Sequence, residues 1–481
     1  MVEKSNYDAV IVGSGPNGLA AGIAMQKAGI SVLILEGKAT IGGGMRTAAL
    51  TLPGFKHDIC SAIHPLAADS PYLKQLPLGD FGLEWIYPLS ALAHPFDDGS
   101  VAVLQKSIAA TAESLGEDGK AYTSLMEAYA PHWDKLAQDL LGPLKFPSHP
   151  LLLTRFGLKA IQPATGFAKR TFKGEMARGM FAGLAAHSML PLEKISTAAI
   201  GLVLGIIGHS KGWPIPKGGS QNLADAMGAY FKSLGGHIET DRMVKSMADI
   251  PPAKAVLFDI TPRQLLRIAG HEFSTLYKCQ LNRFNYGQGV YKVDWALDGP
   301  VPWKAERCME AGTVHLGGTL AEVAASEKAI WNNKHVEKPY VLLAQQSLFD
   351  TTRAPSGKHT LWGYCHVPSG SSINMTASIE QQIERFAPGF KDRIIGKHEM
   401  SAVDFETYNP NYFGGDINGG AQDITQIFTR PALRISPYAT SKKGLYLCSS
   451  STPPGGGVHG MCGFHAAKKA LKDIFDVKIS L

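Results

Sequence analysis

The sequence predicts an α/β protein in which a dinucleotide-binding, Rossmann-like domain is interleaved with a second domain of the α+β class. One observation is a strand–glycine loop–helix–strand pattern at residues 7–36, and another is a second glycine-rich helix pattern near the C-terminus. The third is length, because 481 residues exceed what one ordinary hydrophobic core encloses. We therefore expect two domains around one dinucleotide.

The composition is typical of a globular protein and argues against several other classes. Hydrophobic residues make up 45% of the chain, charged residues 18%, and the net charge is +6. No basic tail, nucleic-acid motif or metal-ligand spacing is present. The six cysteines are scattered without a C-x-x-C pair, which argues against disulfides, structural zinc and dithiol chemistry. Because no secretory signal pattern is present, we expect a cytoplasmic protein.

The first predicted element is a buried strand at Tyr7–Val12, which runs directly into a G-x-G-x-x-G loop at Gly13–Gly18. An alanine-rich helix pattern follows over Leu19–Gly29. The second strand spans Ser31–Leu35 and ends at Glu36. Strand, loop, helix, second strand and terminal acid all occur in register, which is the pattern of a dinucleotide-binding unit.

Each residue type in this unit has a physical task. Gly13 permits a tight turn, Gly15 lets the backbone approach a pyrophosphate, and Gly18 brings the helix against the strand. The helix N-terminus supplies N–H donors and a partial positive charge. An acid at Glu36 accepts hydrogen bonds from ribose hydroxyls and repels a 2′-phosphate. The predicted cofactor-binding residues of this unit are Gly13, Gly15, Pro16, Asn17, Gly18 and Glu36.

A second glycine cluster, Gly42–Gly44 with Arg46 close behind, favours FAD over NAD. It resembles the glycine-doublet motif that follows the second strand in the glutathione-reductase-type FAD fold. That resemblance implies that Gly43, Gly44 and Arg46 lie against the pyrophosphate. The sequence departs from the motif, because Gly44 occupies the usual arginine position. Whether Arg46 reaches the phosphates is left open.

The C-terminal pattern resembles the last motif of such an FAD site. A short strand is predicted at Gly444–Leu447, and Gly455–Gly457 is predicted to open a helix that points at the flavin. The resemblance implies contacts from Ser450, Gly457 and Val458. Serine stands where relatives often carry an aspartate, which predicts a weaker contact there.

Five further segments carry a resemblance to the phytoene-desaturase-related FAD-dependent oxidoreductases. The subgroup is the one that includes the carotenoid isomerase and the pyridine nucleotide-disulfide oxidoreductase domain-containing protein 2. The segments are "PGFKHDICSAIHPLAADSPYL", "FAGLAAHSMLPL", "WPIPKGGSQNLADAM", "YGQGVYKVDWALDGPVPW" and "PPGGGVHGMCG". The family threads its FAD domain through separated segments. This implies an FAD-binding domain at 1–75, 210–285 and 430–481, and a substrate domain with a helical cap at 76–209 and 286–429.

Within these segments, the residue patterns predict further elements. A helix is expected from about Asn222, followed by a strand ending near Val244. The family resemblance places Met243 or Val244 beside the adenine. Residues Ala255–Pro262 are expected to form another buried strand, followed by a turn that ends in proline. Residues 286–345 are predicted to form strands of an antiparallel substrate sheet.

Residues 105–208 are predicted to be mostly helical, and two stretches within them have alternative interpretations. The apolar run Ile195–Gly208 is too short to span a bilayer and is either a buried helix or the wall of an apolar tunnel. The basic, aromatic stretch 151–173 is either an ordinary amphipathic cap or a surface that lies on an anionic membrane. Peripheral membrane contact and a homodimer are left open.

Few side chains are candidates for proton transfer, as suits flavin chemistry. The family motifs place Lys292 near the flavin ring and His459 near the start of the last helix, and both are candidate catalytic residues. His64 and His187 fit core histidines better than acids or bases.

The resemblance implies an FAD-dependent oxidoreductase that transfers hydride between flavin N5 and a lipophilic polyene or isoprenoid-like substrate. Desaturation, saturation and isomerisation all fit. A flavin amine oxidase is the rival enzyme, although no aromatic pair for an amine is recognisable in the sequence. A non-catalytic FAD-containing binding or scaffold protein is the alternative from another class.

Overall fold

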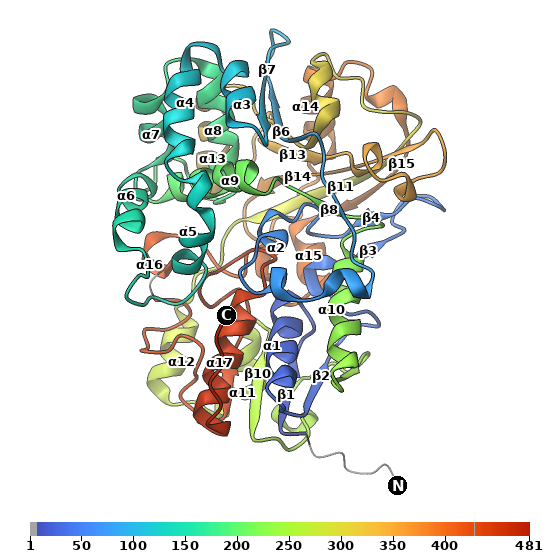
Figure 1. The fold of residues 1–481 in the computed structure, drawn as a ribbon. Helices are drawn as coiled ribbons and strands as arrows, with labels where there is room; N and C mark the ends of the chain where they lie inside the picture. Colours follow the sequence, from blue (N-terminus) through green and yellow to red (C-terminus); the bar gives the residue numbers. More distant parts are fainter. Residues whose placement is uncertain (1–6, 428) are drawn as a thin grey trace.

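A five-stranded parallel sheet forms the lower part of the molecule in Figure 1, in a computed structural model that describes residues 7–427 and 429–481. Its strands are β16 (Leu445–Leu447), β10 (Ala255–Phe258), β1 (Ala9–Val12), β2 (Val32–Leu35) and β9 (His237–Glu239), in that order. β1 is buried along its whole length, as predicted for an apolar strand covered on both faces. Three separated parts of the chain thus contribute to one sheet.

Helices cover both faces of this sheet because the strand side chains alternate between two apolar clusters. Ala9 and Ile11 face the cluster that contains α1 (Pro16–Lys27), α10 (Gln221–Ser233) and α17 (Met461–Phe475). Val10 and Val12 face the cluster that contains α11 (Pro262–Ala269) and α12 (Thr275–Asn282). The parallel, Rossmann-like sheet predicted from the sequence is confirmed.

A seven-stranded sheet forms the upper part of the molecule in Figure 1. Its strands are β15 (Ile394–Met400), β11 (Gly289–Leu297), β14 (His359–Val367), β13 (Val341–Ala344), β12 (Ala311–Leu316), β6 (Ser90–Pro95) and β7 (Val101–Gln105), in that order. All neighbours are antiparallel except the parallel pair β12 and β6. The predicted antiparallel sheet is therefore confirmed apart from that pair, and its role in binding a substrate stays a prediction. Two small ribbons pair β3 (Thr47–Ala48) with β4 (His57–Asp58) and β5 (Trp85–Ile86) with β8 (Ile215–Pro216).

Helices dominate residues 105–208, as predicted, and lie beside the upper sheet in Figure 1. They are α3 (Ile108–Ser114), α4 (Gly119–Glu127), α5 (Trp133–Leu140), α6 (Pro150–Ala160), α7 (Ala164–Thr171), α8 (Glu175–Ala186) and α9 (Thr197–Ser210). The apolar run at 195–208 forms the buried helix α9. In the described part of the chain, no helix combines the length and apolar character needed to cross a bilayer.

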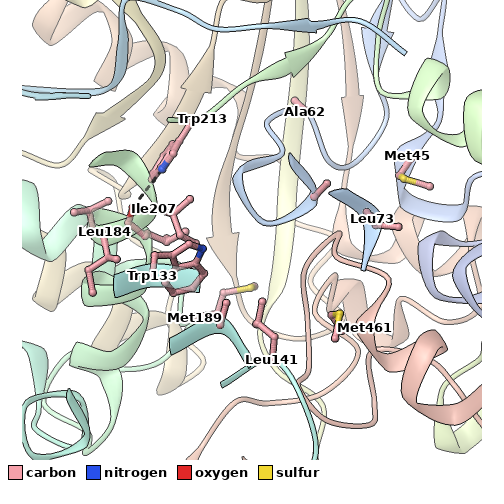
Figure 2. Close-up of a cluster of buried hydrophobic side chains, with 14 of the residues drawn as sticks. Met45, Ala62, Leu73, Trp133, Leu141, Leu184, Met189, Ile207, Trp213 and Met461 are labelled. Carbon is pink, nitrogen blue, oxygen red and sulfur yellow. Dashed lines mark hydrogen bonds between the residues drawn. The ribbon is translucent and has the colours of Figure 1, made fainter. Parts of the chain in front are cut away.

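One apolar cluster joins the helical region to the parallel sheet. Figure 2 shows part of it, with Trp133, Leu184 and Ile207 on the helical side and Met461 on the side of α17. The two sheets therefore share a core. The remaining helices are α2 (Pro65–Ala68), α13 (Leu320–Trp331), α14 (Thr376–Phe386), α15 (Ala402–Tyr408) and α16 (Ile424–Ile427).

Three element predictions need correction. The strand expected to end near Val244 ends at Glu239, so residues 240–246 form an irregular connection. The helix expected at Gly455–Gly457 begins at Met461, because Gly455 and Gly457 have φ angles of +113° and +122° that a right-handed helix excludes. Helix α13 interrupts the region 286–345, which was predicted as strands.

Candidate functional site

A cavity of about 410 Å³ begins at the carboxyl edge of the parallel sheet and reaches the inner face of the seven-stranded sheet. Its volume lies within the range of small-molecule sites, about 300–1,000 Å³. At the carboxyl edge it is flanked by the ends of β1 and β10, which lie on opposite sides of the point where the strand order reverses. Open parallel sheets bind their ligands at such a switch point.

The phosphate-type loop after β1 lines one part of this cavity. Gly13 has a φ of +101°, and its N–H donates to the carbonyl of Leu35 at 2.8 Å. Gly15 is the N-cap of α1, and Pro16 and Asn17 open the helix. Pro16 has no N–H, and the N–H of Gly18 donates to Asp259 at 2.9 Å, so the N–H of Asn17 is the first-turn donor left for an anion in the cavity.

Gly18 supports this loop from behind and does not line the cavity. A Cβ atom at Gly18 would lie 2.1 Å from the carbonyl oxygen of Gly13. The third glycine thus permits the close strand–helix contact that the sequence pattern predicts.

Glu36 and Arg46 form a buried ion pair at the end of β2. The guanidinium nitrogen of Arg46 lies 3.0 Å from Oε1 of Glu36, and both side chains line the cavity. The backbone N–H of Ser14 donates to Oε2 of Glu36 at 3.1 Å. Arg46 also donates to the carbonyl of Thr40 at 2.8 Å. Glu36 is thus held in place at the glycine loop, and Arg46 offsets its negative charge.

Gly43 and Gly44 let the second glycine cluster pack against the first. A Cβ atom at Gly43 would lie 2.9 Å from Cα of Gly15, and one at Gly44 would lie 2.9 Å from the hydroxyl of Tyr412. Both glycines line the cavity. The hydroxyl of Tyr412 thus occupies the space into which a side chain at position 44 would point.

The predicted C-terminal contacts also line the cavity, although no helix begins at the triple glycine. Ser450, Gly457 and Val458 are among the lining residues. Arg430 is buried beneath this loop and donates to the carbonyl oxygen of Ser450 at 3.0 Å. Val244 also lines the cavity, as does Met243, and its place beside an adenine stays a prediction.

Asp259 is a site residue that the sequence analysis missed. It directly follows β10, lines the cavity, and accepts a hydrogen bond from the N–H of Gly18 at 2.9 Å. Burial, together with the neighbouring charge of Glu36, raises the pKa of Asp259 to about 7. Its position at the carboxyl end of a predicted parallel strand was the available signal.

The two candidate catalytic residues lie outside the cavity lining. Lys292 is 1% exposed and forms a buried ion pair with Asp294 on the same strand. His459 accepts a hydrogen bond from the N–H of Met461 at 3.0 Å, and burial lowers its pKa to about 4. His459 is therefore neutral near pH 7 and orders the turn before α17. A catalytic role for either residue stays a prediction.

The far end of the cavity is formed by uncharged side chains from the upper sheet and the helical region. They are His187, Leu204, Trp213, Thr313, Leu342, Trp362 and Tyr364. Burial lowers the pKa of His187 to about 3 and that of His64 to about 4, as fits core histidines better than acids or bases, and both also line the cavity. The other members were missed because they come from separate elements and connections. We call this set the sheet-side lining.

Comparison with known proteins supports the assignment of the fold. Residues 11–76 match the NAD(P)-binding Rossmann-like domain family. The pyridine nucleotide-disulfide oxidoreductase domain-containing protein 2 of Rattus norvegicus is 24% identical over an alignment that covers 98% of this chain and 94% of the rat protein. One of the subunits of limonene dehydrogenase from Castellaniella defragrans is 20% identical, with coverage of 98% and 96%.

Among solved structures, a putrescine oxidase bound to putrescine is similar, with a TM-score of 0.62 and 17% identity. The similarity covers 98% of this chain and 99% of that one. The chain therefore has the fold of FAD-dependent oxidoreductases, with a parallel Rossmann-like sheet and an antiparallel sheet. Its relatives are oxidoreductases.

Proposed function

We propose that this protein is an FAD-dependent oxidoreductase that transfers hydride between flavin and a lipophilic, isoprenoid-like substrate. The observation that carries the proposal is the continuous cavity that joins the glycine loop to the sheet-side lining. The first end suits a dinucleotide and the second suits an uncharged substrate. FAD would bind in the extended manner of the glutathione-reductase-type fold.

The residues at the dinucleotide end fit FAD in type and position. The loop of Gly13 and Gly15 and the N-terminus of α1 would hold the pyrophosphate, and Glu36 would accept from the ribose. Val244 would lie beside the adenine, and Ser450 and the Gly457–Val458 turn would flank the flavin ring. Bound flavin supplies a hydride acceptor or donor at N5, and the protein orients the substrate and excludes water.

The sheet-side lining favours a lipophilic substrate. Leu204, Trp213, Leu342 and Trp362 supply apolar and aromatic surface there. The limonene dehydrogenase to which the chain is similar is named for a small isoprenoid hydrocarbon. A phytoene-dehydrogenase-like reaction would act on one member of this substrate class.

A flavin amine oxidase is the second candidate, because a putrescine oxidase shares the fold and aromatic residues line this cavity. An ammonium ion needs a nearby negative charge or an aromatic cage. Among the described lining residues the carboxylates are Glu36 and Asp259, and both lie at the dinucleotide end. At the sheet side a cationic amine would therefore rely on the aromatic side chains alone, whereas a neutral lipophile needs no counter-charge.

The test begins with the visible spectrum of the purified protein. A yellow protein with one FAD per chain is expected, and its flavin should bleach anaerobically with an isoprenoid substrate. Bleaching by amines alone would favour the amine oxidase. A protein that bleaches with neither substrate nor NAD(P)H would favour the scaffold alternative. A colourless preparation that FAD cannot reconstitute contradicts the proposal.

FAD affinity is expected to fall as pH rises through about 7, where Asp259 ionises. The pKa of Asp259 in the folded protein is raised above the ordinary 3.8. Its neutral form, which favours FAD binding, therefore prevails below a pH of about 7 and is lost above it. Ionised Asp259 would repel a pyrophosphate held at the adjacent Gly18 loop. The decline should approach tenfold per pH unit, about the limit for one linked proton.

The measurement is the FAD dissociation constant of the wild type and of Asp259→Asn between pH 5.5 and 8.5. The asparagine keeps an oxygen that accepts from Gly18, so the fold should be retained. The variant should show a flat profile over this range. Equal slopes for both proteins would show that Asp259 does not control the affinity.

We also propose peripheral contact with an anionic membrane through α6 and the segment before it. Phe146, Leu151 and Leu158 are 89%, 78% and 67% exposed, and Arg155 lies on the same helix and is also exposed. Exposed apolar side chains beside basic ones suit a lipid interface.

The triple variant with serine at these three apolar positions should lower co-sedimentation with phosphatidylglycerol vesicles at least about tenfold. Leu276→Ser, at a leucine 71% exposed on α12, is the control and should bind as wild type. Equal binding by all three proteins contradicts the contact.

A further inference from the structure

The sheet-side lining contains polar groups without partners, and these bear on the chemistry of the substrate. Thr313 and Trp362 are 4% and 7% exposed. Among the described residues, Oγ1 of Thr313 and Nε1 of Trp362 have no hydrogen-bond partner. Buried polar groups in proteins are almost always paired, and an unpaired one loses the hydrogen bonds that it made to water. In the part of the chain that the structure describes, the cavity lining also contains unpaired Oδ1 of Asn17, Nδ1 of His64 and Oγ1 of Thr261, so the two groups on the sheet side need an explanation of their own.

The sheet register places these two groups on the same inner face. Trp362 on β14 lies opposite Ala344 on β13. Because Val314 on β12 pairs with Leu343 on β13, the same antiparallel register sets Thr313 opposite Ala344. Thr313 and Trp362 thus stand two strands apart, with only the small side chain of Ala344 between them. In the next row on this face, Tyr364 on β14 lies opposite Leu342 on β13, and both side chains line the cavity. The unpaired groups therefore belong to one continuous floor.

His187 faces this floor from the end of α8. Its Nε2 lies 3.0 Å from Nε2 of the buried His315, so one ring donates and the other accepts. Burial lowers the pKa of His187 to about 3, and the pKa of His315 is likewise shifted down, so the pair is neutral. The His315 contact fixes the orientation of the His187 ring at the cavity wall. Its Nδ1 is thereby left for a hydrogen bond to an occupant.

The charge distribution narrows the class of occupant further. The charged lining residues among those described are Glu36, Asp259, Lys38, Arg46 and Arg242, and all of them lie at the dinucleotide end. A neutral hydrogen-bonding group suits the sheet side, whereas an ammonium or a carboxylate would lose its hydration there without a counter-charge.

We propose that His187, Thr313 and Trp362 recognise a hydroxyl or carbonyl oxygen on a neutral lipophilic substrate. The inference rests on the proposed function and narrows its substrate class from hydrocarbons to oxygenated isoprenoid-like molecules. Trp362 donates, Thr313 donates or accepts, and His187 complements the oxygen through Nδ1. The aromatic and aliphatic side chains around them hold the carbon skeleton.

The test compares farnesol and farnesene, which share a carbon skeleton; farnesene lacks the hydroxyl and has one more double bond. Binding to the purified FAD-loaded protein is followed by tryptophan fluorescence, to which Trp213 and Trp362 contribute, and the flavin content is measured in parallel. Wild type should bind farnesol at least about tenfold more tightly than farnesene. His187→Phe and Thr313→Val should each weaken farnesol binding about tenfold and leave farnesene binding unchanged.

His271→Gln, at an exposed histidine, is the matched control and should keep the wild-type ratio. Thr313→Val is close in shape to the wild type and keeps the test open if His187→Phe does not fold. Equal binding of the two ligands, or an unchanged ratio in a folded Thr313→Val variant, would overturn the inference while the flavin content still supports an FAD enzyme. A protein that prefers farnesol but cannot hold FAD would overturn the proposed function instead.

Discussion

Replacing Gly18 by alanine is expected to leave a folded protein that binds FAD more weakly, by up to about 100-fold. The added Cβ would lie 2.1 Å from the carbonyl oxygen of Gly13, a backbone atom of the same loop. Neither atom can move without displacing the turn whose N–H groups would face the pyrophosphate. Overpacking of this kind costs about 1–3 kcal/mol, and 100-fold in affinity corresponds to about 2.8 kcal/mol.

The measurement is FAD titration of the flavin-free protein, with circular dichroism to confirm the fold. Gly157→Ala is the matched control, because a Cβ there meets nothing within 4 Å on helix α6. The control should keep wild-type FAD affinity and gain up to about 1 kcal/mol of stability. An alanine at position 18 that binds FAD as tightly as wild type contradicts the role assigned to this loop.

Replacing Arg353 by methionine is expected to lower the free energy of unfolding by about 3–5 kcal/mol. Both side chains of the Arg353–Asp58 pair are fully buried, and a guanidinium nitrogen lies 2.7 Å from Oδ2 of Asp58. Asp58 also accepts from the hydroxyl of Thr47 at 2.6 Å and from the N–H of Ser220 at 2.8 Å. The pair therefore ties the connection after β13 to two segments of the dinucleotide-binding part. Its loss leaves a buried, unpaired carboxylate.

The pH dependence supplies a second check on this pair. Burial alone would raise the pKa of Asp58, but the charge of Arg353 and the hydrogen bonds hold it below its usual value. The stabilisation is therefore present above the ordinary pKa of a carboxyl and is lost as pH falls through the lowered one. Urea unfolding at matched flavin saturation measures the effect. Lys217→Met, which breaks an exposed pair with Glu84, should leave the stability close to that of the wild type. An equally small change in Arg353→Met would refute the argument.

The parts of the site that could be predicted from the sequence are local in the chain. Gly13, Gly15 and Glu36 belong to one strand–loop–helix–strand unit, whose spacing alone places them at the carboxyl edge of a parallel sheet. Gly43 and Arg46 follow closely after Glu36 and line the same cavity. The extent of the FAD-binding domain and the roles of Lys292 and His459 stay predictions.

The errors arose where backbone conformation or packing overrides local pattern. The triple glycine at Gly455–Gly457 suggests a helix start, but its positive φ angles form a turn and the helix begins only at Met461. The segment at 237–244 suggests a strand, but its pairing with β2 ends at Glu239. The sequence left open whether Arg46 reaches the phosphates, and only the folded chain shows the ion pair of Arg46 with Glu36.

The sequence by itself determined the dinucleotide end of this protein, because glycine spacing and strand periodicity act over a few tens of residues. Tertiary structure alone decided the sheet-side lining, in which His187, Thr313 and Trp362 meet from a helix end and two strands. Their convergence depends on strand register and on the packing of α8, and neither leaves a local signal in the chain. The same holds for Asp259, which reaches the glycine loop only because β10 pairs with β1.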